Sequence, residues 1–272
     1  MTYEGRVTEL DYHPCRYGSS RTIFRGPAVR LDTPYTVVVG SSEIYGRYVA
    51  DPLTDRLAER TGRQVVNLGV QNAGIDAFYQ DDDIMQVIEG AETVVLQAMG
   101  AANMSNRFYT VHRRRNDRFL KRSVAMDNLY PDVDFSEFSF TRHMLLRLRE
   151  LSAEKFELVR QELATAWIAR MRSLIERVPG RRILLSIEDR RDQGLGVEPH
   201  FVTPDMLHTL SETLDGIVRC DVTQDFLEID TTEMVYPELE EDVARQCLSP
   251  AAHARIAEAV AEVIRNPRGL TL

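Results

Sequence analysis

Short apolar segments rich in β-branched residues, each followed by a glycine and then a helical pattern, constrain the fold of this chain most. Three such units occupy the first hundred residues, with strands expected at 36–39, 64–68 and 93–96. Runs of this length are typical of strands buried on both faces, as parallel strands are. Their alternation with helices predicts an α/β fold with three layers, α/β/α, around a parallel, doubly wound, flavodoxin-like sheet.

The rest of the chain continues this alternation after an interruption. Further strands are expected at 182–187 and 217–222, giving about five in all, and helices at 43–60, 77–89, 152–178, 204–214 and 251–264. We interpret 1–35 as an irregular lead-in that holds at most a short strand or hairpin. Residues 104–150 form an insertion after the third strand, with structure of its own or the role of a lid, because structureless loops of that length are uncommon. We expect one domain over 1–272.

Composition excludes several classes of protein. A chain of 272 residues can bury a core without disulfides, and its cysteines, Cys15, Cys220 and Cys247, lack metal-site spacing. We therefore expect no metal and no cofactor, and a reducing compartment. No apolar run suits a membrane span or a signal peptide, which predicts a cytoplasmic protein without membrane contact. The net charge of −9 argues against nucleic-acid binding, and nucleotide-binding loop motifs are missing.

Charge is unevenly distributed along the chain. Residues 105–122 form a basic block, and residues 224–242 contain many acids but no lysine or arginine. The blocks solvate the surface or pair with each other, or the basic block attracts an anionic ligand. Arginines bind sulfate, phosphate or carboxylate in a bidentate manner, although Asp132, Asp134 and Glu137 could neutralise them. The arginines proposed to bind such a ligand are Arg107, Arg113, Arg114 and Arg115.

Gly40, Ser41 and Ser42 follow the first expected strand and precede a helix. In an open parallel sheet, ligands bind at the carboxyl ends of the strands. A serine at such a turn exposes its hydroxyl and offers its own N–H to a developing oxyanion. The alternative is that one of the two serines only caps the helix.

These residues, together with three later segments, resemble the sequence blocks of the SGNH/GDSL hydrolases. The segments are Asn67–Gly74, Gly100–Asn103 and Leu248–Ala257, in the order in which that family has them. The resemblance implies that Ser42 is the nucleophile, with Ser41 where the family has aspartate. It also implies that Asn72 or Gly74, together with Asn103, forms an oxyanion hole, with Gly40 and Gly100 in the adjoining turns.

The chain departs from this family at the general base. The family's histidine and its orienting aspartate fall on Cys247 and Ala244. A thiol does not replace imidazole as a base, and serine needs a base to become nucleophilic. A base could come instead from one of the histidines in loops or in the insertion, although each of them is also explained by a surface position; these are His112, His143, His200 and His208. His253 matches a histidine that packs in the family's last helix.

Three functions remain open. The first is hydrolysis of an acyl ester with Ser42 as nucleophile, for which an anionic saccharide is one candidate carrier of the acyl group. The second is a catalytically degenerate SGNH-like protein that binds an anionic glycan or metabolite. The third is a transferase that uses a sulfated or phosphorylated donor. All three predict a small-molecule or saccharide ligand, and the sequence leaves the substrate and the oligomeric state open.

Overall fold

The structure is a computed structural model that describes residues 9–192 and 194–266. The strands are β1 (Tyr35–Gly40), β2 (Gln64–Gly69), β3 (Thr93–Gln97), β4 (Tyr109–Val111), β5 (Phe119–Arg122), β6 (Arg181–Glu188) and β7 (Gly216–Asp221). The α-helices are α1 (Ser42–Tyr45), α2 (Leu53–Thr61), α3 (Asp76–Tyr79), α4 (Asp82–Glu89), α5 (Val124–Leu129), α6 (Thr141–Leu151), α7 (Ala153–Arg177), α8 (Pro204–Leu210), α9 (Thr223–Leu227), α10 (Glu241–Ala244) and α11 (Pro250–Arg265). Three short 3₁₀ helices are η1 (Phe135–Glu137), η2 (Ser211–Thr213) and η3 (Glu238–Glu240).

The centre of the molecule is a parallel sheet with the strand order β2-β1-β3-β6-β7. The predicted parallel α/β fold is confirmed. Along β1, Val37 and Val39 pack into one core cluster and Val38 into the other, because successive side chains of a strand point to opposite faces. Burial on both sides explains the unbroken apolar run from Val37 to Val39.

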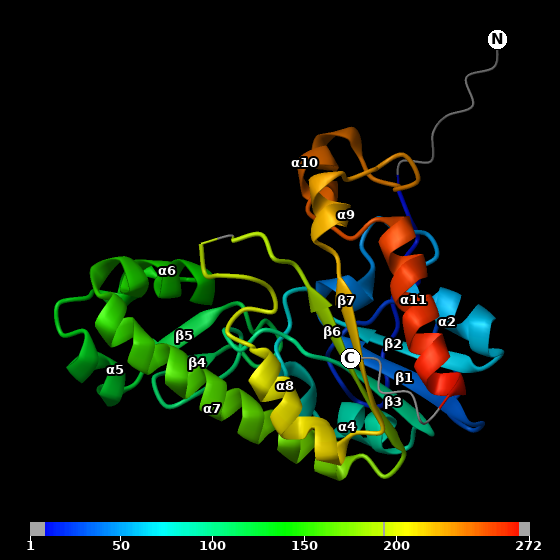
Figure 1. The fold of residues 1–272 in the computed structure, drawn as a ribbon, viewed down its shortest axis with the longest axis horizontal. Helices are drawn as coiled ribbons and strands as arrows, with labels where there is room; N and C mark the ends of the chain where they lie inside the picture. Colours follow the sequence, from blue (N-terminus) through cyan, green and yellow to red (C-terminus); the bar gives the residue numbers. More distant parts are fainter. Residues whose placement is uncertain (1–8, 193, 267–272) are drawn as a thin grey trace.

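Helices cover both faces of this sheet (Figure 1). Helices α2 and α11 pack with Val38 on one face, and helices α4, α7 and α8 pack with Val37 and Val39 on the other. Trp167 of α7 donates a buried hydrogen bond of 2.7 Å to the carbonyl oxygen of Met99. This contact attaches the turn after β3 to the longest helix. No helix within the described ranges is long and apolar enough to cross a membrane.

The prediction of one continuous helix over 43–60 was wrong. Helix α1 stops at Gly46, which adopts the left-handed conformation, and α2 begins only after Pro52. Glycine ends helices in this way without steric cost, and proline favours a new start. The helix expected over 77–89 is likewise divided, because Asp81 accepts a bond from the Ile84 N–H and caps α4. The helix expected over 204–214 ends at Leu210 and continues as η2.

Residues 104–150 contain the β4–β5 hairpin, α5, η1 and α6, which lie beside the N-terminal half of α7 in Figure 1. Whether this region acts as an insertion or a lid stays a prediction. In the described part of the lead-in, Cys15 and Phe24 pair as an isolated antiparallel bridge. Residues 1–8 of that lead-in lie outside the described residues.

Candidate active site

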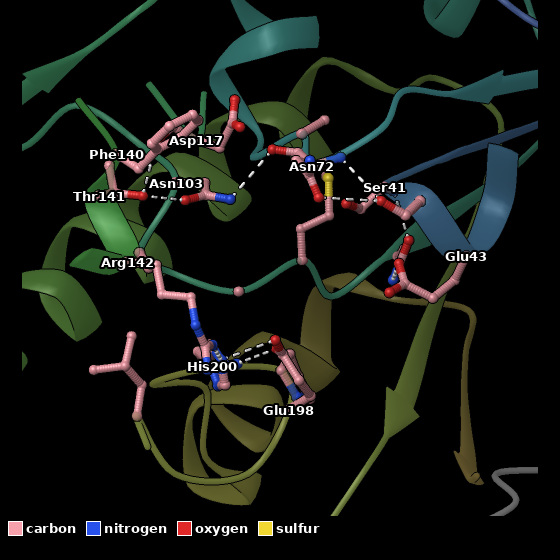
Figure 2. A pocket seen from close by; sticks show the side chains of 18 of the residues that line it. Ser41, Glu43, Asn72, Asn103, Asp117, Phe140, Thr141, Arg142, Glu198 and His200 are labelled. Carbon is pink, nitrogen blue, oxygen red and sulfur yellow. Dashed lines mark hydrogen bonds and ion pairs between the residues drawn. The ribbon is translucent and has the colours of Figure 1, made fainter. Parts of the chain in front are cut away.

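Three turns converge at the carboxyl ends of the adjacent strands β2, β1 and β3. Ser42 follows β1, Asn72 follows β2 and Asn103 follows β3. The Asn72 N–H donates to Ser42 Oγ at 3.0 Å, and Asn103 Nδ2 donates to the Asn72 carbonyl at 3.2 Å (Figure 2). All three residues line one cavity of about 630 Å³. The fold thus brings together residues that are 30 or more positions apart in the sequence.

The local conformation of Asn72 directs its N–H at the serine. Its φ of 55° lies in the left-handed region, which asparagine tolerates better than most residues. Ser42 Oγ also lies 3.5 Å from Asn72 Oδ1 as a donor. The Asn72 N–H therefore bonds to the serine oxygen itself, close to where an oxyanion would form on a carbonyl carbon attacked by Ser42 Oγ.

Asn103 is held from the side of α6. The hydroxyl of Thr141 donates to Asn103 Oδ1 at 2.7 Å. An amide whose oxygen is bonded in this way has its NH₂ group turned toward the opposite side, here toward Asn72. The orientation of Asn103 is fixed by a residue of the 104–150 region.

Gly74 lies beside these residues, but its N–H has another partner. It donates to Asn116 Oδ1 at 2.9 Å, inside the protein. A Cβ on Gly74 would overlap the Asn103 carbonyl oxygen. Of the two positions that the sequence offers for the oxyanion hole, the geometry favours Asn72, and Gly74 lets the two turns approach.

The turn at Gly40 and Ser41 is fixed from β3. Gln97 Oε1 accepts from the Ser41 N–H at 2.7 Å, while Gln97 Nε2 donates to Glu43 Oε2 at 2.9 Å. A Cβ on Gly40 would collide with the Gln97 side chain. One glutamine therefore links the serine turn to the carboxylate next to it, and both Ser41 and Glu43 line the cavity.

The other wall of the cavity carries an acid, an imidazole and a guanidinium. Figure 2 shows Glu198 and His200 across the cavity from Ser41 and Asn72. His200 Nε2 lies 3.0 Å from Glu198 Oε1 and 3.1 Å from Arg142 Nη1, and the His200 backbone N–H donates to Glu198 Oε2 at 2.7 Å. Gly100 lines the same wall, and the Ala101 N–H donates to the His200 carbonyl.

Both titratable groups on this wall are shifted toward neutrality. Removal from bulk water, with the charge of Glu43 as a second cause, raises the pKa of Glu198 to about 7. Burial, aided by the nearby guanidinium of Arg142, lowers the pKa of His200. A carboxyl whose pKa lies near neutrality is suited to proton transfer.

The candidate histidines occupy different places. Within the described ranges, the hydrogen bonds of Ser42 Oγ go to Asn72 and none goes to an imidazole. His200 and His143 line the cavity, the latter packed on Phe138. His112 lies in a neighbouring hollow, and His208 is on the exposed side of α8.

His253 has a structural position. It is buried in α11, where its Nδ1 accepts from the Leu53 N–H at 3.0 Å, and burial lowers its pKa to about 3. Cys247 packs with Tyr48, Met234 and Ala244 rather than lining the cavity. Burial raises its thiol pKa to about 11, so it remains protonated at neutral pH. The two positions where the resembled family has its base and aspartate supply no base here.

The basic block divides into two groups. Arg107 pairs with Glu162, Arg122 pairs with Asp127, and Arg113 donates to the Gln80 carbonyl. Arg114 and Arg115 line the hollow that contains His112. The acidic block pairs with arginines outside the basic block, including Asp225 with Arg255, Glu240 with Arg47 and Glu241 with Arg245. Within 9–192 and 194–266, no three His, Cys, Asp or Glu side chains are grouped to hold a metal ion.

Sequence reasoning missed Gln97, Thr141 and Glu198. Gln97 had a usable signal, since it is a polar residue at the end of a buried apolar strand. Glu198 stands two residues before a histidine that the sequence did single out. Thr141 had no signal, because its contact with Asn103 depends on how the 104–150 region folds back.

Several solved structures resemble this chain. One is a Desulfitobacterium hafniense protein assigned to the G-D-S-L lipolytic family (13% identity, 85% of this chain and 99% of that one, TM-score 0.41). Another is a Corynascus thermopiles (Myceliophthora fergusii) family 2 carbohydrate esterase with its carbohydrate-binding domain (10%, 90% and 70%, 0.46). A third is the acetyl xylan esterase Est2A from Butyrivibrio proteoclasticus (9%, 90% and 66%, 0.45).

These similarities concern the fold. A comparison with curated proteins found no match. Residues 1–268 match the family described as Domain of unknown function (DUF6473), and the chain belongs to that family.

Proposed function

We propose that this protein hydrolyses an acyl ester, with Ser42 as the nucleophile. The observation that carries the proposal is the meeting of Ser42 Oγ, the Asn72 N–H and the Asn103 amide at one cavity. A nucleophile next to two amide donors is what acyl transfer needs, because the attacked carbonyl becomes an oxyanion. In the free protein these donors bond to Ser42 Oγ and to the Asn72 carbonyl, so they would turn to that oxygen when the substrate binds.

Glu198 is the group proposed to move the proton. As a carboxylate it takes the proton from Ser42 Oγ through water in the cavity, while Oγ bonds to the acyl carbon. The protonated carboxyl then returns that proton to the departing alkoxide. A water molecule then attacks the acyl carbon while Glu198 takes one of its protons. The protonated Glu198 returns that proton to Ser42 Oγ as the bond between Oγ and the acyl carbon breaks, and the acid leaves. His200 is a positioning residue, since its backbone N–H and its ring both contact the Glu198 carboxyl.

The cavity suits a small acylated molecule or one sugar unit. Its volume of about 630 Å³ is within the usual range for ligand pockets. Its wall combines apolar side chains such as Leu146 and Met99 with the polar groups already described. The ring of Phe140 also lines the cavity and offers a surface on which a sugar ring can stack.

A second candidate is a binding protein that retains the pocket without catalysis. The specific observation in its favour is that Ser42 Oγ bonds to Asn72 and to no imidazole among the described residues. Catalytic hydrogen bonds are often long or misaligned in free enzymes and tighten with substrate bound. For that reason we place hydrolysis first.

Labelling with a fluorophosphonate, read by intact mass, tests the proposal. We expect one adduct on the wild type, none on Ser42→Ala, and an unchanged adduct on the control Ser211→Ala. Wild type and Ser211→Ala should hydrolyse p-nitrophenyl acetate, and Ser42→Ala should not. If the wild type is neither labelled nor active while Ser42→Ala binds acylated sugars equally well, the protein is the binding protein of the second candidate.

A further inference from the structure

A second hollow of about 880 Å³ lies next to the active-site cavity. Its lining contains four arginines and one histidine together with aromatic and uncharged polar residues. The charged members are Arg21, Arg114, Arg115, Arg118 and His112. Neither the acyl chemistry at Ser42 nor the core of the fold makes use of these side chains.

The two cavities adjoin each other along the chain. At three places, consecutive residues face opposite ways, one into each cavity: Gln71 and Asn72, Arg118 and Asp117, Ser139 and Phe140. The guanidinium of Arg118 lies over the ring of Phe140, 4.7 Å from its centroid. The hollow therefore adjoins the wall of the cavity that contains Ser42.

The charge of the hollow is not neutralised from within. None of the described residues that line it is an aspartate or glutamate. Across residues 9–192 and 194–266, the four arginines form no ion pair, whereas Arg107 and Arg122 each pair with a carboxylate. The nearby carboxyl of Asp117 lines the active-site cavity; burial raises its pKa, while its electrostatic interaction with Arg118, Arg115 and His112 opposes that rise and offsets part of the hollow's positive charge. Four guanidinium groups in one concave surface produce a strong positive potential.

The loop that presents two of these arginines is held in place. His112 Nδ1 accepts from the backbone N–H groups of Arg114 and Arg115, each at 3.2 Å. A ring nitrogen that accepts these bonds carries no proton, so the ring proton of His112 is on Nε2, which can donate. Asn116, fully buried, donates to the carbonyls of His112 and Arg113. A fixed loop loses less entropy on binding than a mobile one.

We propose that this hollow binds a sulfate or phosphate monoester group on the acylated substrate. Guanidinium groups recognise tetrahedral oxyanions through paired hydrogen bonds, and His112 Nε2 adds a further donor. The assignment of the anion to the substrate of Ser42 depends on the proposed function. The binding of the oxyanion itself does not.

The first test measures binding alone. Calorimetric titrations with inorganic sulfate and inorganic phosphate, at constant ionic strength in chloride, use Ser42→Ala as the parent. Arg114→Gln/Arg115→Gln should weaken binding of the preferred anion at least tenfold. The control Arg30→Gln/Arg245→Gln removes the same charge from exposed arginines paired with Asp32 and Glu241, and should change binding less than twofold. Equal weakening in both double variants, or none in the first, overturns the proposal.

The second test asks whether one substrate occupies both the active-site cavity and the hollow. The intact protein should hydrolyse 4-acetoxyphenyl sulfate or the matching phosphate at least tenfold more efficiently in kcat/KM than phenyl acetate. The preference should disappear in Arg114→Gln/Arg115→Gln and persist in the control Arg30→Gln/Arg245→Gln. Oxyanion binding without any ester hydrolysis would remove the proposed function and keep the oxyanion site. Hydrolysis of both esters at equal rates would remove the link between the hollow and the substrate.

Discussion

The hydroxyl of Thr141 and the amide oxygen of Asn103 are joined by a hydrogen bond of 2.7 Å between α6 and the turn after β3. Thr141 is buried, and its hydroxyl determines which side of the Asn103 amide faces Asn72. A residue of the 104–150 region, which lies outside the central sheet, therefore orients a donor of the candidate oxyanion hole.

Replacing Thr141 by valine removes this hydrogen bond without changing the size of the side chain much. We expect kcat for p-nitrophenyl acetate to fall about threefold to tenfold with little change in KM, because oxyanion donors act mainly in the transition state. Thr141→Ser keeps the hydroxyl and should keep most of the activity. A change confined to KM in Thr141→Val would show that the contact does not act on the reacting centre.

The rate of hydrolysis should depend on the ionisation of Glu198. Because its pKa is raised to about 7 and the carboxylate is the base, kcat/KM should rise with pH and be half-maximal near pH 7. Glu198→Gln should lose activity about a hundredfold and lose this dependence. Glu59→Gln, an exposed acid on α2, serves as the control, and a pH profile retained in Glu198→Gln would assign the base elsewhere.

Stability should fall in acid because of His253. Its pKa is about 3 in the folded protein and about 6.5 in an unfolded chain. The unfolded state therefore binds more protons between these values, so stability rises with pH through this window and decreases as the pH falls. The slope from this one group is up to about 1.4 kcal/mol per pH unit. Urea unfolding at several pH values should show it in wild type and in His208→Gln, but reduced in His253→Asn.

Asn116 should be needed for stability as well as for the site. Its side chain accepts from the N–H groups of Gly74 and Ala77 and donates to the carbonyls of His112 and Arg113. Asn116→Ala leaves these buried groups without partners, and we expect a loss of about 3 kcal/mol in the free energy of unfolding. Asn128→Ala, at an exposed asparagine, should change it by less than about 0.5 kcal/mol. Chemical denaturation measures both.

The sequence predicted the strands better than the helices, for a physical reason. Strands β1 and β3 contain runs of β-branched residues, and β6 contains a short apolar run, each too short for an ordinary helix. The break between α1 and α2 was missed because apolar residues continue at helical spacing through the turn at Gly46 and Pro52.

The candidate site could be predicted only where the sheet determines it. Ser42, Asn72 and Asn103 follow adjacent parallel strands, so the topology brings them to one edge. Glu198 and Thr141 reach the same cavity on long connections. Their paths depend on tertiary contacts, such as the pairing of Asp189 with Glu198, which leave no periodic pattern in the sequence.

The missing side chain at Gly74 determines how close two amides can come. Any atom beyond Cα at this position would displace the carbonyl of Asn103, and the backbone of one turn would have to take another path. In a homologue with alanine here, Asn72 or its counterpart would be separated from the amide that now contacts it. Comparing such homologues would show how the absence of a Cβ at position 74 affects the spacing of the donors around Ser42.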